Sequence, residues 1–245
     1  MQAVRRPEPL KGYGVIEPGV ERVVAGRVIS VSKGGPGAHY VYTRRGPGGS
    51  VRRLLGGVER LVAAPAPPVF HPERFTDYVM ARLTTPLVVC GGCSTEAFIV
   101  VKCDVLVLAE GKQLSVIDSF PLGRVRYALY GQPDRGLIAS YTLTRLMYNE
   151  PLIEWLPVVR VVFRNSTSQA VMVERIVFPT SHLQLYYKGG RVVARPLEVV
   201  VTGPGKAYVQ PLQKWRPPKG FTESPRLSRE LIPFTGWRFE MLYGL

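Results

Sequence analysis

Residues 116–141 gather arginine and tyrosine side chains around a Tyr-Gly-Gln-Pro turn, between segments that resemble ordinary strands and loops. Guanidinium groups bind phosphates and carboxylates, and tyrosine rings offer faces on which bases stack. This combination predicts a recognition surface for an anionic partner and specifies no reaction. The candidate binding residues are Arg124, Arg126, Tyr127, Tyr130, Asp134, Arg135 and Tyr141.

A strand over residues 124–130 would place Arg124, Arg126 and Tyr130 on the same face of a sheet. Two arginines beside a tyrosine suit an anionic ligand, and nucleic acid is the leading candidate because it offers phosphates and bases together. The structural alternative has arginines on an outer sheet face and tyrosines packed at a corner of a sandwich. In that arrangement the tyrosine hydroxyls are bonded to backbone.

Cys90 and Cys93 form a Cys-x-x-Cys pair, and Cys103 follows ten residues later. A zinc ribbon usually uses two such pairs, whereas only Cys103 and three histidines remain to complete this one. A thioredoxin-like pair opens a helix, whereas this pair lies between two strand-like runs. We therefore expect a tight turn, with a disulfide if the source is a hyperthermophile, and we predict no metal and no cofactor.

The sequence contains few of the motifs that hydrolases use. The chain has no Gly-x-Ser-x-Gly elbow, and the dispersed His39, His71 and His182 give no reason to pair any of them with a serine. Carboxylate chemistry needs two opposed acids, for which Asp118 and Asp134 are candidates. We predict no catalytic residue, and a hydrolase acting on a carbohydrate or phosphate substrate through carboxylates is the alternative.

The net charge of +14 is concentrated at the two ends of the chain. Residues 1–60 hold 11 basic and 4 acidic side chains, giving +7, and residues 181–245 hold 10 and 4, giving +6. Such a balance attracts nucleic acid, acidic proteins or anionic membrane surfaces without a specific site. Basic charge scattered over the whole surface is the alternative.

The elements that must position these residues are strands. Short runs of β-branched and aromatic residues alternate with Gly-, Pro- and Asn-rich turns, which predicts an all-β protein of mostly antiparallel β-sandwich type. Residues 96–109 resemble one long inner strand, apolar on both sides. The glycine clusters at 34–37 and 46–49 lack the Lys-Ser/Thr ending of a phosphate-binding loop, so we interpret them as hairpin turns. At most one or two short helices are expected, one of them after Ser224-Pro225.

A length of 245 residues suits one large β domain or two smaller ones. We predict an N-terminal β domain over 12–115, a second β-sandwich over 116–212, and a Pro- and aromatic-rich tail over 213–245 packed on the domains. One extended sandwich is the alternative. The aromatic tail also raises a further possibility, that the protein is a structural subunit of a larger complex.

Residues 1–14 lack the continuous apolar segment of a secretory signal, because Arg5, Arg6 and Pro7 interrupt it. Apolar runs elsewhere fall well short of the roughly 18 residues of a membrane span. We therefore predict a cytoplasmic protein without a transmembrane segment. Its predicted function is that of a non-enzymatic binding or assembly module recognising an anionic partner, nucleic acid or an acidic protein.

The central motifs carry a family resemblance that extends over residues 78–202. They resemble an uncharacterised archaeal family, the one catalogued as domain of unknown function 432. The resemblance implies an archaeal source, supplies no activity, and does not include the cysteine pair, the glycine-rich start or the tail. The residues that carry it are Ile117, Asp118 and Phe120; Arg126, Tyr127, Leu129, Tyr130, Gly131 and Pro133; Gly136, Leu137, Ile138 and Tyr141; Arg160, Phe163 and Asn165; Ile176, Val177 and Phe178; and Tyr186 and Tyr187.

Overall fold

The structure is a computed structural model that describes residues 9–34, 40–56, 58, 60–73, 75–111, 114–226 and 238–245. It confirms the predicted fold class, because nearly all regular structure is β-strand and most strand pairs are antiparallel. Within the described residues the one helical element is a 3-10 turn, η1 (Thr180–His182). The C-terminal helix predicted over residues 226–232, before Pro233, lies outside the described part except for Arg226.

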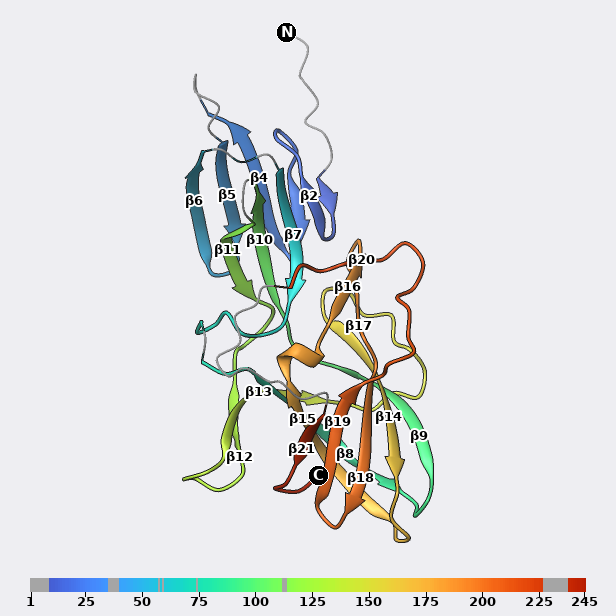
Figure 1. Ribbon diagram of the computed structural model, residues 1–245. Helices are drawn as coiled ribbons and strands as arrows, with labels where there is room; N and C mark the ends of the chain where they lie inside the picture. The colour runs from blue at the N-terminus through green and yellow to red at the C-terminus, as the bar shows by residue number, and fades with distance from the viewer. Residues whose placement is uncertain are drawn as a thin grey trace.

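Two sheets form the upper part of the molecule in Figure 1 and face each other as a sandwich. Their inner faces carry core residues such as Ile29 and Val31 from one sheet and Leu61 and Val107 from the other. The first sheet has the order β1 (Leu10–Lys11), β3 (Arg22–Val24), β4 (Arg27–Lys33), β5 (Tyr40–Gly46), β6 (Gly49–Leu55). The second has the order β11 (Ser115–Pro121), β10 (Asp104–Glu110), β7 (Arg60–Ala66), β2 (Gly14–Ile16).

Two further sheets form the lower part (Figure 1). One has the order β12 (Tyr127–Tyr130), β13 (Leu137–Thr144), β8 (Tyr78–Val89), β15 (Val171–Pro179). The other follows the order β20 (Thr222–Glu223), β16 (Leu185–Lys188), β17 (Arg191–Ala194), β14 (Pro157–Asn165), β18 (Leu197–Gly203), β19 (Lys206–Pro211), β21 (Phe239–Met241), with β9 (Ser94–Val100) also paired to β14. In Figure 1 the β12–β13 hairpin projects from one side of this lower part.

The chain crosses between the two parts more than once. The single strand predicted over 96–109 is wrong: β9 pairs with β14 in the lower part, and β10 pairs with β7 in the upper part. The break falls at residues 101–103, where the apolar pattern continues because Val101 and Cys103 are buried and β10 is buried on both sides. Strand β10 also pairs with β11 across the predicted boundary between 12–115 and 116–212, and the division into domains stays a prediction.

The described part of the tail lies on the lower sheets. Strand β21 pairs with β19, the Trp215 ring packs against Tyr186, and the Tyr243 ring packs edge-on against Tyr130. Phe234 and Trp237 fall outside the described residues. No helix in the described part of the chain is long and apolar enough to cross a membrane, and the cytoplasmic location stays a prediction.

Cys90 and Cys93 form a disulfide at the turn between β8 and β9, with 5.3 Å between their Cα atoms. The turn packs tightly on the loop after β14. The Thr167 carbonyl accepts a hydrogen bond of 2.9 Å from the Gly92 N–H, and a Cβ atom on Gly91 would lie 2.3 Å from the Ser168 carbonyl oxygen. The pair therefore fixes a corner where two strand connections meet.

Replacing both Cys90 and Cys93 with serine is expected to lower the free energy of unfolding by about 2 kcal/mol, because the bridge restricts a short loop of the unfolded chain. Urea unfolding with and without dithiothreitol measures this. The reductant should destabilise the wild type by the same amount and leave the double variant unchanged. Detection of all three thiols in the denatured, unreduced protein would contradict the bridge.

Candidate functional site

An open hollow lies beside the first residues of the β12–β13 hairpin. Its walls are formed by Arg124, Arg126, Tyr127, Ala128 and Tyr141. The backbone explains the grouping: Tyr127 is opposite Ser140, and the Tyr141 N–H donates a 2.8 Å hydrogen bond to the Arg126 carbonyl. This bond continues the ladder one residue before β12, so Arg126 and Tyr141 are neighbours on one face.

Lys102 fixes the loop that carries these arginines. Its Nζ atom donates to the Arg124 carbonyl at 2.7 Å and to the Tyr141 carbonyl at 3.1 Å. Partial burial lowers the pKa of Lys102, and the charge of Arg126 lowers it further. Two arginines thus line the hollow with Lys102 bonded to the backbone beside them, and none of the residues that line it is acidic.

A narrow cleft shares Arg124 with the hollow. The Asp104 carboxyl in this cleft is buried and accepts a 3.0 Å hydrogen bond from the Phe70 N–H. Burial raises the pKa of Asp104 to about 7, an effect that the Phe70 bond offsets in part. The cleft is lined by Pro68, His71, Lys102, Cys103, Asp104, Pro121, Leu122, Gly123, Arg124, Val125 and Ser140.

Tyr127 connects the hollow to the cleft. Its hydroxyl donates a hydrogen bond to the His71 carbonyl, and its ring packs edge-on against Phe75 with 4.5 Å between centroids. Burial lowers the pKa of His71, and burial also raises the pKa of Tyr127. The sequence also allowed tyrosines with hydroxyls bonded to backbone, as the alternative to a binding role. Tyr127 has such a bond and also lines the hollow.

The other predicted binding residues lie elsewhere. Strand β12 begins at Tyr127, so only the last four residues of the predicted strand over 124–130 form a strand. Tyr130 is 1% exposed, donates to the Gly244 carbonyl at 2.9 Å and accepts from the Tyr243 N–H at 3.1 Å, which makes it an anchor for the tail. Asp134 and Arg135 are exposed in the β12–β13 turn and pair with each other at 3.3 Å.

Sequence reasoning missed Lys102, His71 and Asp104. The first and last lie at the break between β9 and β10, which the continuous apolar pattern concealed. The lone charged pair Lys102 and Asp104, flanking Cys103 inside an apolar run, was the available signal. Charged residues inside a buried strand need partners, so they mark a place where the strand ends or a site begins.

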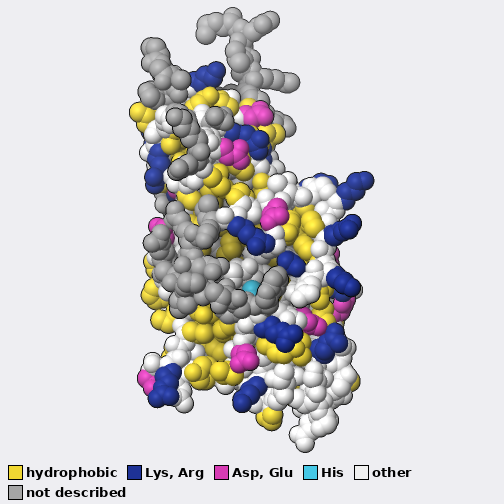
Figure 2. Space-filling model, in the orientation of Figure 1, with side chains coloured by type: hydrophobic (Ala, Val, Ile, Leu, Met, Phe, Trp, Pro, Cys, Tyr) yellow, Lys and Arg dark blue, Asp and Glu magenta, His cyan; other side chains and the backbone are white. Residues whose placement is uncertain are grey.

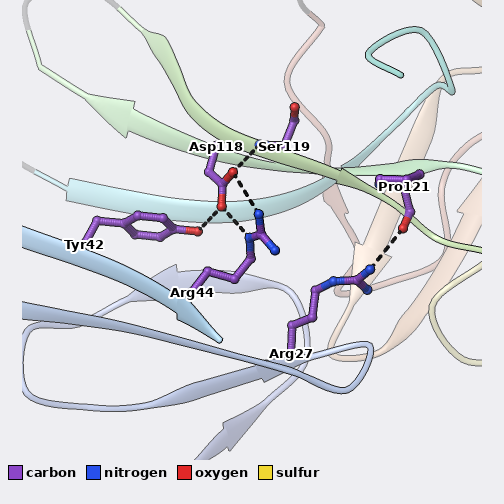
Figure 3. Close-up of polar contacts among 6 residues, drawn as sticks. All are labelled: Arg27, Tyr42, Arg44, Asp118, Ser119 and Pro121. Atoms are coloured by element: carbon purple, nitrogen blue, oxygen red, sulfur yellow. Dashed lines mark hydrogen bonds and ion pairs between the residues drawn. The ribbon is translucent and has the colours of Figure 1, made fainter. Parts of the chain in front are cut away.

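Asp118 and Asp134, the two carboxylates considered for hydrolysis, have different surroundings. Asp118 is buried and accepts hydrogen bonds from the Tyr42 hydroxyl at 2.6 Å, from Arg44 Nε at 2.6 Å and from the Ser119 N–H at 3.0 Å (Figure 3). The Phe120 ring lies against the guanidinium groups of Arg27 and Arg44. Asp118 thus joins β5 to β11, whereas Asp134 is exposed to solvent at a turn.

A deeper cavity of about 240 Å³ lies between β7 and β10 on one side and η1 and β16 on the other. Most of its walls are apolar, including Phe70, Leu106 and Leu183. None of the seven predicted binding residues lines it, so this cavity is separate from the hollow.

Basic side chains do not form one continuous patch on the face shown in Figure 2. Lys and Arg are distributed over the upper and lower parts, with Asp and Glu among them. The basic hollow is defined by the five residues of its walls and by Lys102 beside them.

Comparison with known proteins gives one family. No curated protein and no solved structure matches the chain significantly. A family model matches residues 13–235, a wider range than the resemblance at 78–202 and one that includes the glycine-rich start and much of the tail. The chain therefore belongs to the family described as Protein of unknown function (DUF432).

Proposed function

We propose that the protein is a non-enzymatic binding module that holds an anionic partner, single-stranded nucleic acid, at the basic hollow. The observation that carries the proposal is the grouping of Arg124 and Arg126 with two tyrosine rings in a hollow that has no acidic wall, with Lys102 bonded to the backbone beside it. Cations around an open hollow attract an anion, and the absence of a carboxylate from its lining leaves their charge available.

The tyrosines favour nucleic acid over an acidic protein. Tyr127 and Tyr141 line the hollow beside the arginines, so a phosphate held by a guanidinium group would place its base near a ring. Base stacking on aromatic side chains contributes about 1–3 kcal/mol per base and tolerates any sequence. A glutamate-rich chain would use the charges alone.

Replacing Arg124 and Arg126 together with alanine is expected to weaken binding of an oligothymidine and to reduce its salt dependence. Each phosphate contact to a single strand contributes about 0.7 to the slope of log K against log salt concentration, so loss of two contacts lowers the slope by about 1.4. Fluorescence anisotropy at several salt concentrations measures both quantities. Tyr141→Ala should weaken binding and leave the slope unchanged.

The matched control removes two exposed charges outside the hollow, Arg135→Ala in the β12–β13 turn with Lys206→Ala at the start of β19. This variant has the same net charge as the first, so it separates the hollow from general attraction. Equal slopes for the two double variants would contradict the proposal. Displacement of the oligonucleotide by polyglutamate at equal charge concentration would contradict the preference for nucleic acid.

A further inference from the structure

Strand β6 leaves one edge of the upper sandwich open. It pairs with β5 through seven consecutive residue pairs without a register shift, and it pairs with no other strand in the described part of the chain. Figure 1 shows it at the outer edge of its sheet. Edge strands are commonly protected by short length, a bulge, a proline or charged side chains. Strand β6 has seven residues, no bulge and no proline, and its only charged side chains are Arg52 and Arg53.

The register decides which backbone groups face outward. Gly46 and Gly49 close a two-residue turn, and the residues of such a closing pair exchange both backbone hydrogen bonds. Hydrogen-bonded and non-hydrogen-bonded pairs then alternate along the hairpin. Val51 and Arg53 therefore bond to β5, whereas Ser50, Arg52 and Leu54 direct their N–H and C=O groups away from it. Leu54 is 71% exposed, and Ser50 and Arg52 are exposed as well.

The side chains around this edge are basic. Strands β4, β5 and β6 contain six basic residues and no acidic one. Arg44 is paired with buried Asp118, and Arg45 with Glu21 at 2.9 Å. Arg52 and Arg53 form no ion pair within the described chain, and their side chains point to opposite faces of the sheet. The charge at the outer edge is thus left without compensation.

We propose that β6 accepts an extended acidic segment of a partner protein as an added strand. The outward backbone groups of Ser50, Arg52 and Leu54 would bond to that segment, as in other cases of strand addition. Acidic side chains opposite Arg52 and Arg53 would pair with them across the two faces. This surface belongs to the upper sandwich and does not depend on the basic hollow.

Two other occupants fit less well. A second copy of this chain, docked through its own β6, would bring four arginines together without an acid, and like charges on opposite strands repel. Nucleic acid binds sheet surfaces through exposed aromatic rings, but β6 has none, and on the adjacent strand Tyr42 is buried and Tyr40 is half-buried against the core. Charge and backbone geometry together therefore favour an acidic peptide.

The test uses the full chain and a fluorescent peptide with the core Val-Glu-Glu-Val, with Val-Lys-Lys-Val as its counterpart. Arg52→Ala removes the charge and keeps the outward N–H, whereas Arg52→Pro removes both without breaking a bond to β5. We expect the proline variant to bind the acidic peptide at least about fivefold more weakly than the alanine variant. Lys206→Ala should bind like the wild type, and circular dichroism checks that all variants are folded.

Hydrogen exchange provides a second readout. Binding of the acidic peptide should slow exchange at the amides of Arg52 and Leu54 and leave those of Val51 and Arg53 unchanged. Equal binding by the proline and alanine variants, or equal binding of the lysine peptide, would overturn the proposal. Displacement of the peptide by an oligothymidine would also overturn it, because that result assigns the edge to nucleic acid. Concentration-dependent dimerisation that Arg52→Pro abolishes would likewise overturn it, because that result assigns the edge to a second copy of the chain.

Discussion

Asp118→Ala is expected to lower the free energy of unfolding by about 3–5 kcal/mol. The substitution leaves the Arg44 guanidinium, which is 8% exposed, without its anion, and it also removes the acceptor of the Tyr42 hydroxyl. A buried charge without a partner must be desolvated with no compensating interaction, and this cost exceeds that of an ordinary core substitution. Urea unfolding followed by fluorescence measures the change.

The next residue along β5 provides the matched control. Arg45 points to solvent and pairs with Glu21 at 2.9 Å, with the two side chains 62% and 39% exposed. Because exposed pairs contribute little, Arg45→Ala should cost less than about 1 kcal/mol. A similar small loss for Asp118→Ala would mean that water reaches Arg44 and that the pair is not buried. Arg44→Met combined with Asp118→Leu should recover much of the lost stability, because it removes both charges.

Asp104→Asn is expected to stabilise the protein increasingly as pH rises from 4 to 8. Burial raises the pKa of Asp104 from 3.8 to about 7, so the folded state holds a proton that the unfolded state has already lost across this range. The wild type therefore loses stability from this group as pH rises towards 7, and the asparagine variant does not. A pKa that is higher by about three in the folded state corresponds to a change in the free energy of unfolding on the order of 4 kcal/mol.

The measurement compares urea unfolding of the wild type and of the Asp104→Asn variant at several pH values. Asparagine keeps an oxygen that can accept the hydrogen bond from the Phe70 N–H, so the comparison isolates the charge. A difference between the two proteins that stays constant with pH would show that the Asp104 carboxyl ionises at an ordinary pKa.

The pairing of strands could not be predicted from the order of apolar residues. Strands β9 and β10 form one apolar run in the sequence, yet they belong to different sheets, because β9 pairs with β14 whereas β10 pairs with β7 and β11. The run at 192–201 likewise divides into β17 and β18 around Pro196, and both strands lie parallel to β14. Periodicity reports burial, and it does not report which strand supplies the contact.

The candidate site was predicted in part. The sequence pointed to Arg124, Arg126, Tyr127 and Tyr141 because arginine and tyrosine suit an anionic ligand. In the structure these four residues line one hollow. The sequence could not separate them from Tyr130, because the buried position of that ring depends on Tyr243 and Gly244 more than 100 residues away. The position of Lys102 beside the hollow also depends on residues distant in sequence, because its Nζ atom bonds to the Arg124 and Tyr141 carbonyls.

The amino-acid sequence by itself determined the strand-rich fold class and the basic charge, because turn residues and β-branched runs act locally and charge depends on composition. Only the tertiary structure decided which charges are compensated and which are open. Arg44 is neutralised inside the sandwich by Asp118, whereas Arg52 on the adjacent strand is exposed at an edge. The physical reason is that burial and pairing depend on contacts between segments that are distant in sequence, which no local pattern encodes.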